Sequence, residues 1–436
     1  MRSGRLVGSM FVAAALGATL VVAACSGDDG QTGPAGSPGP TGAQGQPGPP
    51  GEGAPGTDGG ATPLSGACTQ PCHTFNGVVD QWRFSNHSHP QNSEIGGGAC
   101  GNCHGIDGIE QRRANKFVAV TDAGAPANVP QGHISFTASN GSVGEIAYGG
   151  ATTIGRIHCS TCHDFNATND PHVTGKYTAR QAPLRVPGGV NDVAYLEASP
   201  ADAGATVGQP LAYRSANLCV FCHKSRKDVK FYVPANRTMN SYRWGPHEAT
   251  QADVFSGKGG YEFAGKSYGV AKHQEIADAC VSCHMQPAPG NGDVPDHTMK
   301  PALTLCKTCH GQSMTTYDPT GGRNNLIAGL RELRTLLNDR NLLTRATVAP
   351  YAGLNEEEVA DTQFHLDKVR QNSGPAGAHQ TLSADEAGAV YNYLIIARSK
   401  DLGAHNPVYT RQLLWDSISL LKLGVAPAVL SAPNRP

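Results

Sequence analysis

The sequence predicts a fold of short helices and irregular loops that ends in an all-helical bundle, and two observations lead to this prediction. The pattern Cys-x-x-Cys-His occurs five times between residues 100 and 310. The chain of 436 residues also contains 54 Gly and 30 Pro, while aromatic residues make up only 6% of it. A chain so rich in turn-forming residues is poorly suited to building an ordinary hydrophobic core. We therefore expect a large apolar group to take the place of a core around the repeated motifs.

The repeated pattern is typical of the covalent attachment of c-type haem. Two thiols add to the vinyl groups of the porphyrin, and the adjacent histidine becomes the proximal axial ligand of the iron. The thioether cysteines of these motifs would be Cys100, Cys103, Cys159, Cys162, Cys219, Cys222, Cys280, Cys283, Cys306 and Cys309, and the proximal ligands His104, His163, His223, His284 and His310. The expected fold class is accordingly a multihaem cytochrome c, with mostly irregular loops and short helices packed around the haems.

Other uses of cysteine fit the pattern less well. Structural zinc sites take cysteine pairs in twos and do not require a histidine after each second cysteine. Thioredoxin-like redox motifs do not recur five times in one chain, and disulfide frameworks belong to short secreted domains rather than to chains of this length. The pattern therefore favours haem.

A sixth, less regular motif lies at residues 68–73, where three residues separate Cys68 from Cys72 and His73 follows directly. Of the 13 cysteines, ten belong to the regular motifs and one, Cys25, ends an apolar stretch near the N-terminus. Cys68 and Cys72 either form a local disulfide beside an unrelated histidine or attach a haem with His73 as its proximal ligand. We predict the haem, which makes six haem c groups in all.

Residues 1–24 have the features of a signal peptide, because Arg2 and Arg5 are followed by an apolar stretch that ends at Cys25. This arrangement resembles a bacterial lipoprotein signal, in which Cys25 would be lipidated and become the mature N-terminus. The alternative is a transmembrane helix of about 18 residues, which is at the lower limit for spanning a bilayer. Because c-type haem is normally attached outside the cytoplasm, we expect an exported protein, lipid-anchored at the outer membrane or the cell surface.

Residues 25–66 would carry the lipid anchor and a collagen-like spacer. Glycine occurs at every third position from Gly30 to Gly51, and the spacing resumes from Gly53 to Gly59. A collagen triple helix needs this spacing because only glycine fits at its axis. The stretch could equally be a monomeric spacer stiffened by proline, so a homotrimer and a simple spacer both stay open. Extended, its roughly 30 residues would span about 90 Å at ~3.1 Å each.

Residues 67–312 contain all six motifs and form the predicted haem-binding domain. Neither a Gly-rich phosphate loop nor a serine-type catalytic constellation is recognisable there, and residues 190–196 are a candidate strand. The net charge of −1 does not imply nucleic acid or an anionic membrane surface as a partner.

Residues 313–436 change in character and are predicted to be helical. Leucine and isoleucine recur at helical spacing over residues 326–337. A second helix start is possible at residues 355–358, and residues 383–386 form a capping box for a helix that Gly403 would end. Asn-Pro at residues 406–407 is typical of a helix start with proline at its first position. We therefore expect a C-terminal all-α bundle without haem motifs of its own.

The chain has more histidines than the motifs require. Six of the 17 His are proximal, which leaves eleven for six irons. This surplus suggests that many serve as second axial ligands, although any single one could instead be a surface or hydrogen-bonded residue.

Residues 82–87, residues 244–247 and residues 403–409 resemble the distal-histidine segments of multihaem cytochromes from dissimilatory metal-reducing bacteria. More distantly, residues 80–420 are similar to the pentahaem nitrite reductases, which also end in long helices bearing a distal histidine. The resemblance implies distal ligands at His87, His247, His273, His297 and His405, with His172 or His158 as the sixth.

Two axial histidines leave no open position on an iron, so the favoured function is electron transfer rather than catalysis. The resemblance implies extracellular electron acceptors or partner cytochromes as redox partners. The alternative is a nitrite- or hydroxylamine-converting oxidoreductase with one open haem. The nitrite reductases use lysine in place of one proximal histidine, whereas all six motifs here end in histidine. A subunit of a conducting array is a third possibility.

Overall fold

The computed structural model describes residues 77–88, 103, 134–137, 143–146, 157–165, 182–190, 192–196, 209–225, 228–233, 244–287, 293–344, 364, 367–369 and 382–436. All of them belong to one compact unit that spans Thr62–Pro436. Several predictions fall outside these residues: the signal with Cys25, the glycine repeat, the motif of Cys68, Cys72 and His73, residues Cys100, His104 and His172, and the helix start at residues 355–358.

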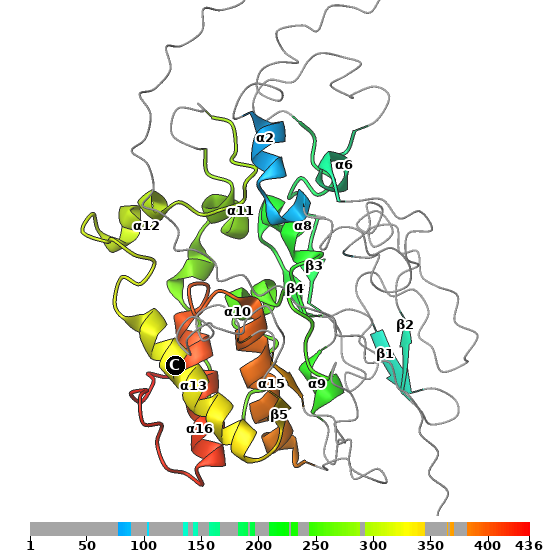
Figure 1. The fold of residues 1–436 in the computed structure, drawn as a ribbon. Helices are drawn as coiled ribbons and strands as arrows, with labels where there is room; N and C mark the ends of the chain where they lie inside the picture. Colours follow the sequence, from blue (N-terminus) through cyan, green and yellow to red (C-terminus); the bar gives the residue numbers. More distant parts are fainter. Residues whose placement is uncertain are drawn as a thin grey trace, which may run out of the picture. The chain divides into compact units, whose positions relative to one another are not determined.

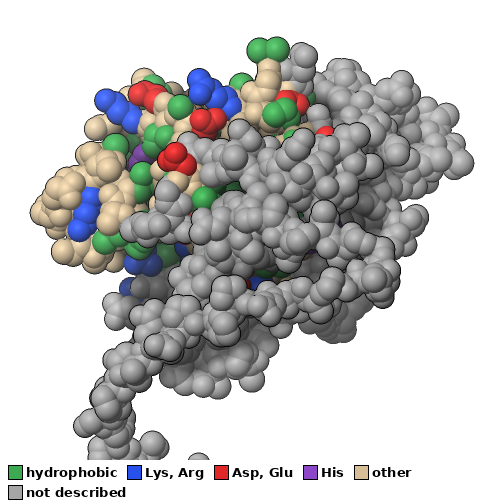
Figure 2. All heavy atoms as spheres, turned by 90° about the horizontal axis from the view of Figure 1, so that it is seen from above, with side chains coloured by type: hydrophobic (Ala, Val, Ile, Leu, Met, Phe, Trp, Pro, Cys, Tyr) green, Lys and Arg blue, Asp and Glu red, His purple; other side chains and the backbone are tan. Residues whose placement is uncertain are grey.

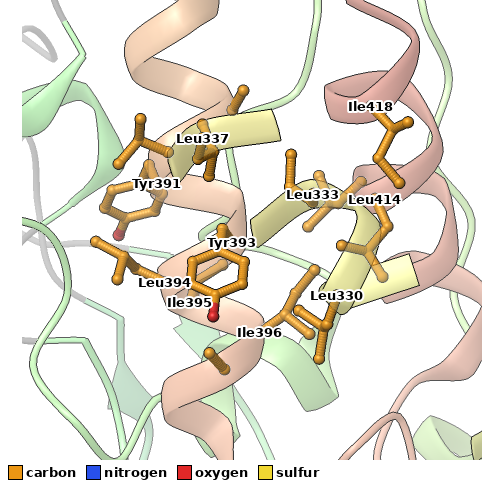
Figure 3. Close-up of a cluster of buried hydrophobic side chains, with 14 of the residues drawn as sticks. Leu330, Leu333, Leu337, Tyr391, Tyr393, Leu394, Ile395, Ile396, Leu414 and Ile418 are labelled. Atoms are coloured by element: carbon orange, nitrogen blue, oxygen red, sulfur yellow. The ribbon is translucent and has the colours of Figure 1, made fainter. Parts of the chain in front are cut away.

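Three long helices pack together in the C-terminal part, as the sequence predicts (Figure 1). They are α13 (Gly322–Asp339), α15 (Ala384–Ser399) and α16 (Pro407–Leu421). Leu330 and Leu333 of α13 point toward Tyr393 of α15 and Leu414 of α16 in Figure 3, and all four side chains are fully buried. Burying each such side chain contributes about 1.5–3 kcal/mol, so this bundle supplies a conventional core.

The caps of these helices follow from local sequence. The hydroxyl of Ser383 accepts a hydrogen bond from the backbone N–H of Glu386 at 3.2 Å, and the Glu386 carboxylate accepts from the Ser383 N–H at 3.1 Å. The predicted capping box is therefore confirmed. At α16 the side chain of Asn406 accepts from the Tyr409 N–H at 3.1 Å, and proline occupies the first helical turn.

The predicted end of α15 at Gly403 is wrong. The helix stops at Ser399, and Lys400 takes the left-handed conformation with φ of 59°. Gly403 also has positive φ, 87°, but it lies in the turn that leads into α16. A left-handed cap at Lys400, whose backbone N–H donates to the Ala397 carbonyl, ends the helix instead of glycine.

Replacing Ser383 by alanine is expected to destabilise the bundle by about 1 kcal/mol, because the N–H of Glu386 loses its acceptor. Chemical denaturation followed by helical circular dichroism measures this loss. Ser383→Asp is the matched control, since aspartate also accepts from the first-turn N–H groups and should retain most of the stability. An alanine variant as stable as the parent would show that the box contributes nothing here.

The strands form three two-stranded antiparallel ladders in the described part of the chain. They pair β1 (Ile134–Thr137) with β2 (Val143–Ile146), β3 (Ala194–Tyr195) with β4 (Pro210–Leu211), and β5 (Leu343–Thr344) with β6 (Lys368–Val369). The candidate strand at residues 190–196 is thus reduced to two residues. The ladder of β5 and β6 also corrects the prediction of an all-α C-terminal region, because it lies between α13 and α15.

Irregular loops and short helices make up most of the remaining described structure, as expected. The bounds of these helices are α2 (Val78–Arg83), α6 (Cys159–Cys162), α8 (Asn217–Val220), α9 (Val229–Tyr232), α10 (Gln251–Ser256), α11 (Ala279–His284) and α12 (Leu303–His310), with 3-10 turns η2 (Asn86–Ser88), η4 (Arg214–Ala216) and η5 (Lys272–Glu275). The motif region is tied to the bundle through α10 and α15. The hydroxyl of Thr250 donates to the Ile395 carbonyl at 2.7 Å, and both groups are buried.

The described surface carries charges of both signs. Figure 2 shows Lys and Arg side chains interspersed with Asp and Glu side chains over the described residues of one face. Within the residues that the structure describes, no helix combines the length and the apolar character needed to cross a bilayer.

Candidate functional site: motif turns and paired histidine rings

Each of the four described regular motifs lies on a single helical turn. The first cysteine accepts a backbone hydrogen bond from the histidine four residues later, at 2.9 Å in the motifs of His163 and His223. Residues three and four apart lie on the same side of a helix. The turn therefore directs both thiols and the imidazole toward one side, which is what a porphyrin with two thioether bonds and a proximal ligand requires.

Four predicted distal histidines lie beside four predicted proximal histidines from distant parts of the chain. The ring centroids are 5.8 Å apart for His87 and His223, 6.3 Å for His297 and His163, 6.0 Å for His273 and His310, and 6.2 Å for His405 and His284. Each pair joins one motif histidine to one histidine outside the motifs. In the first pair the two Nε2 atoms are 3.5 Å apart.

These separations suit an iron between the two rings. A metal held at about 2 Å from each of two imidazole nitrogens places those nitrogens about 4 Å apart and the ring centroids about 6 Å apart. All four centroid distances are close to this value. The residues present therefore fit two-sided axial ligation of a haem at four of the motifs.

Hydrogen bonds at Nδ1 orient the rings of these pairs. The Nδ1–H of His163 donates to the Pro183 carbonyl at 3.2 Å, and that of His297 donates to the Pro295 carbonyl at 2.8 Å. Because a carbonyl oxygen only accepts, both rings carry their neutral-state proton on Nδ1 and keep a lone pair on Nε2. Nε2 is thereby left as the ligating atom in both rings.

Acceptor atoms also lie at Nδ1 of His284, His223 and His87. The Nδ1–H of His284 donates to the Met299 carbonyl at 2.8 Å. Nδ1 of His223 lies 3.1 Å from the Gln251 side-chain oxygen, and Nδ1 of His87 lies 2.7 Å from the Met299 sulfur. Met299 thus contacts a ring of two different pairs.

Burial keeps several of these rings neutral. Burial and the adjacent His223 lower the pKa of His87 to about 4. Burial also lowers the pKa values of His163, His223, His297 and His405 below the ordinary value of histidine. The neutral imidazole is the form that binds a metal, so the environment favours the ligating state.

Several motifs lie next to one another. The thiol of Cys103 lies 3.9 Å from the Phe221 carbonyl, and the thiol of Cys222 lies 3.8 Å from the Cys103 carbonyl. A hydrogen bond with Cys280 and burial raise the pKa of Cys219 well above its ordinary value, and the same bond lowers the pKa of Cys280. Attachment points of three motifs therefore meet around residues 219–223.

The remaining distal candidates are placed differently. His247 is exposed and its Nδ1–H donates to the Glu248 carbonyl at 2.8 Å. His158 is also exposed, and its Nδ1 accepts from the Ser160 N–H at 3.1 Å as the N-cap of α6. The proximal histidines still to be matched, His73 and His104, lie outside the described residues, as does His172.

The ligand groups occur as pairs rather than as clusters. Among the described residues, no group of three or more His, Cys, Asp and Glu side chains is placed to hold a metal ion, and the described cysteines are all free thiols. A structural zinc ion needs four protein ligands. A haem iron needs only two axial ligands, because the porphyrin supplies the other four.

The sequence did not reveal the residues that orient the rings. Met299, Pro183 and Pro295 act through backbone carbonyls, which have no sequence signature. Asp401 lies 3.5 Å from Nδ1 of His405 and could have been found, because a carboxylate four residues before a histidine in a turn is close enough to reach it.

Comparisons with known proteins are consistent with this site. No family model matches the chain, and no solved structure matches it. The C-type polyheme cytochrome OmcB of Geobacter sulfurreducens, from two strains, is 25% identical over 356 residues, which cover 75% of this chain and 44% of OmcB. OmcC of the same organism is 25% identical over 298 residues, which cover 62% of this chain and 37% of OmcC. The chain thus spans less than half the length of these curated relatives. This distant similarity to polyhaem cytochromes, together with the five attachment motifs, supports a multihaem c-type cytochrome.

Proposed function

We propose that the chain is a hexahaem c-type cytochrome that carries electrons across or outside the cell envelope, toward extracellular acceptors or partner cytochromes. The observation that carries this proposal is the set of four histidine pairs, each formed by one motif histidine and one distant histidine. A pair of axial histidines leaves no position for a substrate. The names of the relatives, C-type polyheme cytochromes, agree with the proposal.

The residues of each pair would have three tasks. Haem, when bound, supplies a one-electron iron couple. The chain would hold it through two thioether bonds and two imidazoles, and the carbonyl acceptors at Nδ1 of His163, His284 and His297 would keep those rings in one tautomer and orientation. His87, His163, His223 and His297 are half-buried, which would limit the water at the site and reduce the reorganisation needed when its charge changes.

The remaining parts of the proposal rest on the sequence. Cys68, Cys72 and His73 would hold the sixth haem, and His104 would be the proximal ligand of the haem on Cys100 and Cys103. His247 and His172 are the favoured distal ligands for these two haems, because His158 already caps α6. Cys25 would carry the lipid anchor, and the glycine repeat would serve as spacer or trimerisation segment.

Purified protein should contain six covalent haems, all low-spin. Intact-mass measurement counts the haems, and electron paramagnetic resonance reports the spin state of each iron. Five haems with a mass two hydrogens lower would show a disulfide between Cys68 and Cys72. A high-spin haem that binds and turns over nitrite or hydroxylamine would replace the carrier proposal with the enzyme alternative.

A further inference from the structure

Polar groups close to the end of α15 lie behind the outer ring nitrogens of two of the histidine pairs. Nδ1 of His223 lies 3.1 Å from the side-chain oxygen of Gln251, whose amide N–H donates to the Ser399 carbonyl at 2.8 Å. The Ser399 hydroxyl donates to one carboxylate oxygen of Asp401. The other oxygen of Asp401 lies 3.5 Å from Nδ1 of His405. A neutral amide thus lies at Nδ1 of His223, whereas a carboxylate lies near Nδ1 of His405.

The carboxylate of Asp401 is buried. Its side chain is 2% exposed, and it also accepts from the His405 backbone N–H at 2.8 Å. Asp401 Oδ2 lies 3.5 Å from Nδ1 of His405, whose ring is a neutral neighbour rather than a cation. A buried negative charge with little solvent around it acts strongly on charges nearby. Through the ring of His405 this charge would act on the iron that His405 would ligate.

Neutral groups lie at Nδ1 of six other paired rings, those of His87, His163, His223, His273, His284 and His297. Carbonyl oxygens accept from His163, His297, His284 and His273, the last at 3.4 Å from the carbonyl of His405 itself. Asp296 adjoins His297, but its carboxylate accepts from the Thr298 N–H and is partly exposed to water, which screens it.

We infer that Asp401 is a positioning residue that gives the haem between His284 and His405 the lowest reduction potential of the four described pairs. This inference rests on the proposed function. The oxidised iron carries one more positive charge than the reduced iron, so a buried carboxylate behind its ligand stabilises the oxidised state.

The test is a redox titration of the full-length, haem-loaded protein, followed by visible absorption and electron paramagnetic resonance. Asp401→Asn keeps the shape and a hydrogen-bond acceptor but removes the charge. It should move the lowest-potential component upward, leave the other components in place, and keep every haem low-spin. Asp401→Glu, the conservative variant, keeps the negative charge and should leave the potential of this component close to that of the parent protein. The haem whose potential changes in Asp401→Asn should be the same haem that becomes high-spin in His405→Ala.

A reciprocal variant sharpens the test. Gln251→Glu places a carboxylate at Nδ1 of His223 and should move a different component downward, that of the pair His87 and His223. If Asp401→Asn moves no component, or moves all of them equally while the haems stay bound and low-spin, the inference is wrong and the proposed function is unaffected. If the parent protein lacks covalent haem or is largely high-spin, the proposed function itself fails.

Discussion

Replacing His405 by alanine is expected to convert one low-spin haem to high-spin without changing the number of haems bound. The ring of His405 lies 6.2 Å from that of His284, and it is held by the turn between α15 and α16. Alanine would remove one proposed axial ligand and leave the proposed thioether bonds at Cys280 and Cys283 unchanged. Intact mass should therefore still show the parent haem count, while electron paramagnetic resonance should gain one high-spin signal.

Two variants serve as controls for this result. His405→Met should remain low-spin with a higher potential at one haem, because methionine is also an axial ligand and favours the reduced iron. Phe255→Leu alters a ring 6.1 Å from His405 without removing a ligand, and it should leave the spin state unchanged. An alanine variant that remains fully low-spin would show that His405 does not ligate the iron.

Replacing Asp367 by alanine should destabilise the C-terminal bundle by about 3–5 kcal/mol, because it leaves a buried guanidinium without its carboxylate. Arg334 Nη2 lies 2.6 Å from Asp367 Oδ1, with side chains 8% and 1% exposed. The hydroxyl of Tyr393 donates to the other carboxylate oxygen, and the Arg334 guanidinium lies over the Phe364 ring. Denaturant unfolding monitored by circular dichroism measures the loss.

A double variant separates the cost of an unpaired charge from the value of the pair. Arg334→Met with Asp367→Leu replaces both charges by apolar groups and should be markedly more stable than Asp367→Ala alone. Glu248→Gln is the surface control, because the pair of Lys400 and Glu248 is about half exposed and should contribute less than about 1 kcal/mol. A loss for Asp367→Ala as small as that of the surface control would contradict the expectation.

Local features of this chain could be predicted from the sequence because they depend on residues close together along it. The motif turns need only a cysteine, a cysteine three residues later and a histidine one further on, and the backbone bond from His163 to Cys159 shows that a single helical turn suffices. The capping box of Ser383 with Glu386 and the start of α16 at Asn406 are equally local. The resemblance to known distal-ligand segments also indicated His87, His247, His273, His297 and His405, and all of these except His247 lie beside a motif histidine.

The pairing of those histidines was decided only by the tertiary structure. His87 meets His223 across 136 residues, and no spacing rule links two positions so far apart in the chain. The same holds for the groups behind the rings, since the Met299 carbonyl reaches His284 and the Gln251 amide reaches His223 only after the loops have packed. The β5–β6 ladder within the helical region likewise reflects long-range packing that overrides local preference. The spacing of cysteine and histidine along the chain thus predicted where haem would be attached. Long-range packing decided which two imidazole rings lie side by side and which polar groups lie at their Nδ1 atoms.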